Sequence, residues 1–166
     1  MPRERAMPSD SRAKGSAKLL VVDDDPATLE ALSTVLTEAG YTVSLAQGGD
    51  EALDHLDAQT TLPDLLLVDL MMPNGSGWDL TDGLREHPDW RDLPIVYMTA
   101  GGSTLLARAP VAVGYLNKPI EIDRLLQVVR RAIETTRARK LARLGSGTRR
   151  RECPDGSDSE GESEAG

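Results

Sequence analysis

Residues 64–77, DLLLVDLMMPNGSG, carry the strongest folding signal in the chain. The four consecutive apolar residues at 65–68 are too few for a buried helix, but they suit a strand that is buried on both faces. The strand ends at Asp69, and the PNGSG run that follows cannot continue it. An aspartate at the carboxyl end of a parallel strand lies where open α/β sheets bind ligands. Taken alone, Asp69 suits the start of an ordinary turn equally well, so its neighbours must decide its role.

The same strand signal recurs along the chain, with a helical segment after each strand. Further strands are expected at 18–22, 41–46, 94–99 and 112–116. Helical spacing and helix-start residues predict helices at about 26–39, 49–62, 77–86, 100–110 and from 120 onward. The helix at 100–110 should be short, since two glycines open it and a proline closes it. This alternation predicts an α/β fold with helices on both faces of a parallel sheet.

The chain of 166 residues has room for one ordinary domain. Residues 1–17 are expected to form a disordered arm, 18–140 the domain, and 141–166 a disordered tail that is basic and then acidic. Cys153 is the single cysteine, so no intramolecular disulfide can form, and a cytoplasmic location is expected. Neither a secretory leader nor a membrane span is expected.

Polar side chains stand at the ends of four of the expected strands. Asp23 and Asp24 follow the first strand, Asp69 the third, Thr99 the fourth and Lys118 the fifth. In a doubly wound sheet of order 2-1-3-4-5, the first and third strands are neighbours, so their carboxylates should meet. Converging acids repel each other unless they share protons or hold a cation. Mg²⁺, a hard ion that prefers oxygen ligands, is the expected occupant.

This arrangement suits the transfer of a phosphoryl group to a carboxylate. Asp69 has the chemistry to attack phosphorus and form an acyl phosphate. Such transfer depends mainly on positioning and on neutralising charge, which Mg²⁺, the Lys118 ammonium and the Thr99 hydroxyl would provide. Each residue alone is most often an ordinary strand-end residue. Their joint occurrence favours a phosphoryl-accepting site.

Four segments, LLVVDDDP, LLLVDLMMPNGSG, PIVYMTA and GYLNKP, resemble in this order the motifs of receiver domains of bacterial two-component response regulators. The resemblance covers about residues 18–135. It implies a flavodoxin-like, doubly wound sheet of five strands with five helices, and bound Mg²⁺. It also implies a phosphoryl group supplied by a sensor histidine kinase or a histidine phosphotransfer protein, and a downstream protein that the sequence does not identify.

The resemblance implies a role for each candidate residue. Asp69 matches the phosphate acceptor and Lys118 the phosphate-binding lysine. The metal ligands that it implies are Asp23, Asp24, Asp69 and the backbone carbonyl of Met71. Thr99 matches the switch hydroxyl and Tyr115 the switch aromatic, while Pro119 matches a proline that follows a cis peptide bond. A phosphoryl group on Asp69 would draw Thr99 inward, and Tyr115 would fill the space.

Two departures from the family pattern affect this interpretation. Thr99 and Lys118 are about three residues closer in sequence than is typical, so the intervening helix should be short and the usual dimer contact there is in doubt. Met71 and Gly101 occupy the positions that tend to set the rate of phosphoryl hydrolysis in this family. Neither side chain can hold an attacking water by a hydrogen bond, which predicts a long-lived phosphorylated state.

The same residues fit more than one function. The leading hypothesis is a stand-alone, single-domain response regulator. The main alternative is a Mg²⁺-dependent phosphohydrolase, because Asp23 and Asp25 have the D-x-D spacing of enzymes that form an aspartyl-phosphate, although Thr28 lies one residue too far on. A receiver-like scaffold that is never phosphorylated is a third option. The basic stretch 124–151 is either a solvated helix end or a docking segment for an acidic partner or nucleic acid, masked by the acidic tail. Non-specific nucleic-acid binding is not expected of a chain with a formal charge of −8.

Overall fold

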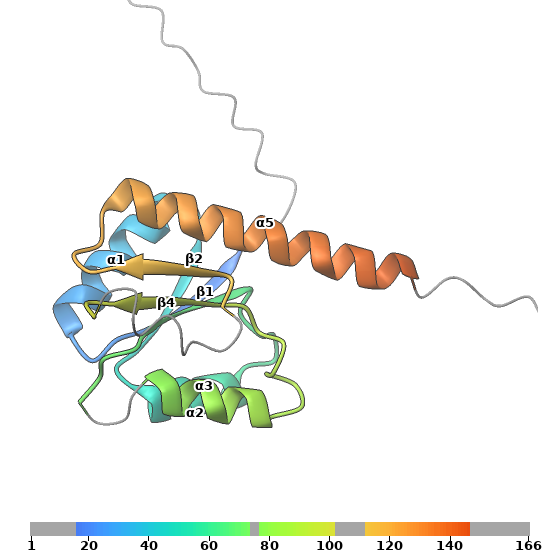
Figure 1. Ribbon diagram of the computed structural model, residues 1–166, viewed down its shortest axis with the longest axis horizontal. Coiled ribbons are helices and arrows are strands. Elements are labelled where there is room, and N and C mark those ends of the chain that lie inside the picture. Colours follow the sequence, from blue (N-terminus) through green and yellow to red (C-terminus); the bar gives the residue numbers. More distant parts are fainter. Residues whose placement is uncertain (1–15, 74–76, 102–111, 147–166) are drawn as a thin grey trace, which may run out of the picture.

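The computed structural model describes residues 16–73, 77–101 and 112–146, which form a parallel sheet with helices on both faces (Figure 1). The sheet has five strands in the order β2-β1-β3-β4-β5, and every neighbouring pair is parallel. The strands are β1 (Lys18–Val22), β2 (Thr42–Ala46), β3 (Leu65–Asp69), β4 (Ile95–Thr99) and β5 (Gly114–Asn117). The expected fold class and strand order are therefore confirmed, with strand ends that differ from the expected ones by at most two residues.

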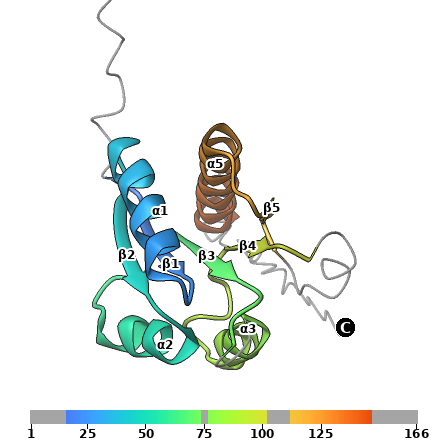
Figure 2. The ribbon, with the colours of Figure 1, turned by 90° about the vertical axis from the view of Figure 1, so that its left-hand side faces the viewer.

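The described helices lie in two layers, one on each face of the sheet. They are α1 (Pro26–Glu38), α2 (Gly49–Ala58), α3 (Gly77–Glu86) and α5 (Ile122–Ser146). Figure 2 shows α1 and α5 on one face and α2 and α3 on the other. The helix expected at 100–110 falls almost wholly on residues 102–111, which lie outside the described part of the chain.

The apolar pattern of the strands explains the layering. The central strands β3 and β4 are buried at every position, while the edge strand β2 is buried only at Ala46. Alternate residues of the central strands face two separate cores, one under α1 and α5 and the other under α2 and α3. Each fully buried leucine contributes about 2 kcal/mol of transfer free energy, which fixes the register of these strands and hence their carboxyl ends.

Local signals set the boundaries of α1. Asp25 caps the helix, because its side chain accepts a hydrogen bond from the Ala27 N–H at 3.2 Å. The Thr28 hydroxyl also donates to Asp25, at 2.7 Å, and this bond lowers the pKa of the Asp25 carboxyl. Gly40, with φ +96°, follows the helix in the left-handed region that favours glycine. Helix α1 therefore begins directly after the acidic run that follows β1.

Helix α5 continues beyond residue 140, where the expected domain ends. It reaches Ser146, and both Leu141 and Leu144 on this last part are exposed.

At the other end of the domain, the Ser16 hydroxyl donates a hydrogen bond to the Gly40 carbonyl at 2.6 Å, and Ala17 is buried. The division into arm, domain and tail stays a prediction. Among the described residues, no helix combines the length and the apolar character needed to span a membrane.

Candidate functional site

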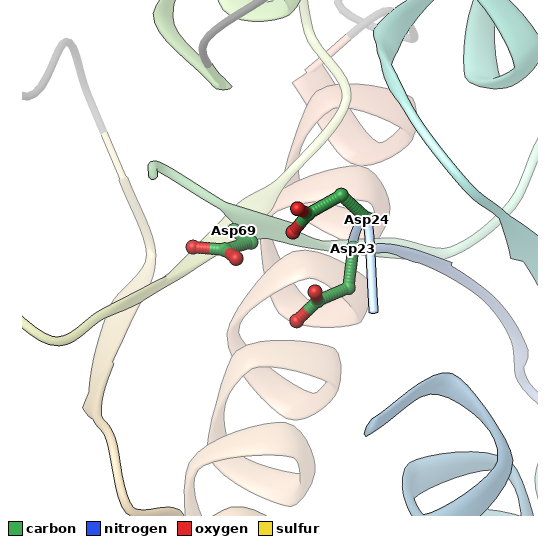
Figure 3. Close-up of side chains that lie close together, drawn as sticks. All are labelled: Asp23, Asp24 and Asp69. Carbon is green, nitrogen blue, oxygen red and sulfur yellow. The ribbon is translucent and has the colours of Figure 1, made fainter. Parts of the chain in front are cut away.

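The strand order brings together three carboxylates from two distant parts of the sequence. Asp23 and Asp24 follow β1, and Asp69 ends β3, the strand beside it (Figure 3). One carboxylate oxygen of each residue lies within 4.8 Å of the others. Asp23 and Asp69 are buried, at 0% and 3% exposure, whereas Asp24 is exposed. The predicted meeting of these acids at one edge of the sheet is thus observed.

Lys118 bridges the two buried carboxylates. Its Nζ donates to Asp23 Oδ2 at 2.8 Å and to Asp69 Oδ2 at 2.9 Å. The other oxygen of each carboxylate accepts a backbone N–H from two residues further on, that of Asp25 at 3.0 Å and that of Met71 at 3.0 Å. Every bond in this set is charge-assisted, which favours a fixed geometry of the two acids.

Burial and charge act against each other on the ionisation of this site. Burial raises the pKa of the Asp69 carboxyl, and the nearby Asp23 raises it too, while the Met71 N–H and Lys118 lower it by a smaller amount. For Lys118, burial lowers the pKa, but the hydrogen bonds to Asp23 and Asp69 outweigh this and raise it overall. Lys118 is therefore charged at neutral pH. With one ammonium against three carboxyl groups, the site favours a further cation.

The donor set fits Mg²⁺. Carboxylate oxygens are the ligands that this ion prefers, and it usually takes one or two from the protein while keeping several waters. Asp24 offers an exposed carboxylate next to the two buried ones, on the solvent side of the site. The backbone carbonyl of Met71 stays a predicted ligand. The Met71 side chain is 58% exposed and belongs to neither of the two core clusters.

Thr99 and Tyr115, the two switch candidates, lie on the neighbouring strands β4 and β5. Thr99 is fully buried at the end of β4, and its Oγ1 accepts the Gly101 N–H at 3.0 Å. Because Asp69 pairs with Met98, Thr99 stands one residue further along the strand beside the acceptor. Tyr115 is half-buried and stacks on Tyr97, with ring centroids 6.2 Å apart. Their roles as switch residues stay predictions.

The segment after β5 also contributes to the site. The Lys118 N–H donates to the Thr99 carbonyl at 2.9 Å, which ties the ends of β4 and β5 together. The Lys118–Pro119 peptide bond is cis, as the resemblance implied. Lys118 is thus held by its backbone as well as by its side chain.

Gly77 is a site residue that the sequence reasoning missed. A Cβ at this position would overlap the Asp69 carbonyl oxygen, closer than real contacts allow, and would make a tight contact of 3.0 Å with the Leu70 Cα. Its N–H donates to the Leu70 carbonyl at 3.4 Å. The first residue of α3 therefore packs directly on the backbone of the acceptor segment. The only sequence signal was a glycine at the start of the helix that follows the acceptor loop.

Gly77→Ala is expected to destabilise the protein by about 3 kcal/mol, because the added methyl group overlaps backbone atoms that cannot move freely. Gly83→Ala in the same helix is the matched control, since its Cβ meets only Leu53 Cδ1, at 3.9 Å. The control should be neutral or more stable by up to about 1 kcal/mol, from the better helix propensity of alanine. Urea unfolding measures both values, and equal stability of the two variants would contradict the close approach.

Comparisons with known proteins agree with this fold and site. The family model of the response regulator receiver domain matches residues 19–130. Response regulator MprA of Mycobacterium bovis is 38% identical over 130 residues, which cover 76% of this chain and 55% of that protein. Transcriptional regulatory protein DltR of Streptococcus agalactiae is 36% identical over 135 residues, covering 78% of this chain and 58% of that protein. The chain thus matches little more than half the length of these curated relatives.

Solved structures show the same likeness. The chemotaxis response regulator CheY4 of Vibrio cholerae superposes with a TM-score of 0.63 at 32% identity, covering 70% of this chain and 98% of that one. A putative response regulator from Chloroflexus aurantiacus gives a TM-score of 0.63 at 36% identity, covering 72% and 98%. The five-stranded fold and the matching family model define a receiver domain. The chain belongs to the response regulator receiver domain family.

Proposed function

We propose that Asp69 accepts a phosphoryl group from a sensor histidine kinase or a histidine phosphotransfer protein, and that the phosphorylated domain binds a downstream protein. The observation that carries this proposal is the placement of the Lys118 ammonium between Asp23 and Asp69, beside Asp24. A buried acceptor carboxylate, a cation and a set of metal ligands within a few ångströms are the components that phosphoryl transfer requires.

The reaction is a displacement at phosphorus. A carboxylate oxygen of Asp69 forms a new P–O bond while the P–N bond of a phosphohistidine donor breaks, and the released imidazole keeps the electron pair and takes up a proton from solvent. In this proposal Lys118 balances the charge on the transferred oxygens, as its contact with Asp69 Oδ2 supports. Asp23 and Asp24 would hold Mg²⁺, which would supply further positive charge.

Thr99 supports the proposed signalling step. Its Oγ1 already accepts the Gly101 N–H, so the hydroxyl proton remains available to donate to an oxygen on Asp69. A shift of Thr99 would change the space near Tyr115, which is half-buried and packs on Tyr97, its strand partner two residues before Thr99. In this proposal the chain signals through a change of surface and does not turn over a metabolite.

A direct test uses the purified protein, acetyl phosphate and Mg²⁺. The intact mass should increase by one phosphoryl group, and peptide mapping should place it on Asp69. Chelation of divalent ions with EDTA should reduce the reaction strongly. A protein that gains no mass under these conditions, although it is folded by circular dichroism, would contradict the proposal.

The phosphorylated state is expected to be long-lived. Met71 is 58% exposed beside the acceptor but carries no strong hydrogen-bonding group, and Gly101 carries no side chain. Neither residue can position an attacking water, so Met71→Asn should speed the loss of the phosphoryl group several-fold, while Met71→Leu should leave it unchanged. The decay of the phosphorylated mass after removal of the donor measures both. A half-life of seconds in the wild type, unchanged in Met71→Asn, would rule this explanation out.

A further inference from the structure

Three aromatic side chains form a row across the face of the sheet that α2 and α3 cover. The chain has two Trp, three Tyr and no Phe, so large rings are scarce. Trp78 of α3 lies with its ring centroid 6.0 Å from that of Tyr97 of β4, and Tyr97 lies 6.2 Å from Tyr115 of β5. Both separations are within the range in which aromatic pairs attract each other. Tyr97 is fully buried, and it is the only member that touches both of the others in this row.

Tyr97 is also tied to the backbone of the acceptor segment. Its hydroxyl lies 3.0 Å from Thr81 Oγ1, and Thr81 in turn donates to the Gly77 carbonyl at 2.7 Å. Because the Thr81 proton is used in that bond, the Tyr97 hydroxyl is the donor to Thr81. Gly77 packs on the Asp69 carbonyl, as described above. The Tyr97 ring is therefore held in place at its hydroxyl end, two residues before Thr99 on the same strand.

We propose that Tyr97 is a positioning residue that couples the state of Asp69 to helix α3 through the row of Trp78, Tyr97 and Tyr115. This inference rests on the proposed phosphorylation of Asp69. A Tyr115 ring that turns when Thr99 shifts changes its stacking on Tyr97, its direct partner across β4 and β5. The Tyr97 ring, which is buried and contacts both other rings, passes this change to Trp78. Phosphorylation would therefore alter the α3 surface as well as the surface next to Tyr115.

Tryptophan fluorescence tests the coupling when Trp78 is the only tryptophan. Trp90→Phe removes the other one and keeps an aromatic ring against His87, on which Trp90 stacks at 3.8 Å. In this parent, addition of beryllofluoride with Mg²⁺ should change the emission of Trp78. Tyr97→Phe, which keeps the ring, should retain the change, whereas Tyr97→Met, which fills the space without a ring, should reduce it about fivefold or more.

A second variant breaks the row at its partly exposed end and so guards against misfolding of the buried substitution. Tyr115→Leu should also reduce the Trp78 change about fivefold or more, after correction for the fraction of protein that binds beryllofluoride. The two Tyr97 variants separate a coupling role from a purely structural one. Both lose the hydrogen bond to Thr81, but only Tyr97→Phe keeps the ring, so a difference between them is due to the ring.

The outcomes distinguish this inference from the function on which it rests. If the wild type gains no phosphoryl mass from acetyl phosphate, the proposed function fails and the coupling fails with it. If phosphorylation occurs, but the Trp78 change is absent in the parent or equally large in Tyr97→Met, only the coupling is overturned. An equally large Trp78 change in Tyr97→Met would mean that Trp78 responds to Asp69 directly through Gly77, which lies next to Trp78 in α3.

Discussion

Asp69→Asn should abolish phosphoryl acceptance, with a decrease in rate of about a thousandfold or more. The amide has nearly the same shape as the carboxylate and can still accept the Met71 N–H, so the fold should persist. It lacks the negative oxygen that attacks phosphorus, so no acyl phosphate can form. The measurement is the intact mass of the protein after incubation with acetyl phosphate and Mg²⁺, followed by peptide mapping of any residual label.

The chain contains a matched control for this substitution. Asp64 lies just before the amino end of β3, and its Oδ2 accepts the Lys18 N–H at 2.8 Å, away from the candidate site. Asp64→Asn should therefore accept phosphate as the wild type does. A label that mapped to Asp23 would contradict the proposal and favour a phosphohydrolase that uses the acids after β1, whereas the absence of label on any residue would favour an unphosphorylated scaffold.

Lys118→Met should slow phosphoryl acceptance by about a hundredfold to a thousandfold, because it removes the ammonium that neutralises the transferred oxygens while keeping the length of the side chain. Stability should change as well. Without Lys118, the buried carboxylates of Asp23 and Asp69 lose the cation that donates to both. Breaking a fully buried pair costs about 3–5 kcal/mol, and the 25% exposure of the Lys118 side chain reduces the expected loss to about 2 kcal/mol.

Mg²⁺ distinguishes the two effects of this substitution. A divalent ion between the carboxylates should restore much of the stability of Lys118→Met, since it neutralises the same charges, but it should not restore the rate. Urea unfolding with EDTA and with Mg²⁺ measures the first effect, and the phosphorylation assay measures the second. Lys140→Met, on the exposed part of α5, is the control and should change neither. Wild-type rates in Lys118→Met would contradict the role given to this lysine.

The sequence alone determined the layout of the domain. Strands β1 and β3 begin and end close to where the apolar runs predicted, because a short run of buried residues leaves little freedom in where a central strand stops. The place of Asp69 at the carboxyl end of the sheet follows from where β3 ends. The alternation of strands and helices predicted a parallel sheet, and the resemblance to receiver domains implied the doubly wound order that the structure confirms. In that order β1 and β3 lie side by side, so the acids that follow them meet.

Tertiary structure alone decided the contacts that give the site its geometry. Lys118 is 95 residues from Asp23 and 49 from Asp69, yet a single ammonium serves both, and no local pattern specifies which oxygens it reaches. The close approach of Gly77 to the Asp69 backbone depends on how α3 packs against the sheet. The contact of Tyr97 with Tyr115 likewise depends on strand pairing. The periodicity of apolar residues indicates whether a side chain is buried. Which side chain it contacts is decided only when distant segments pack together.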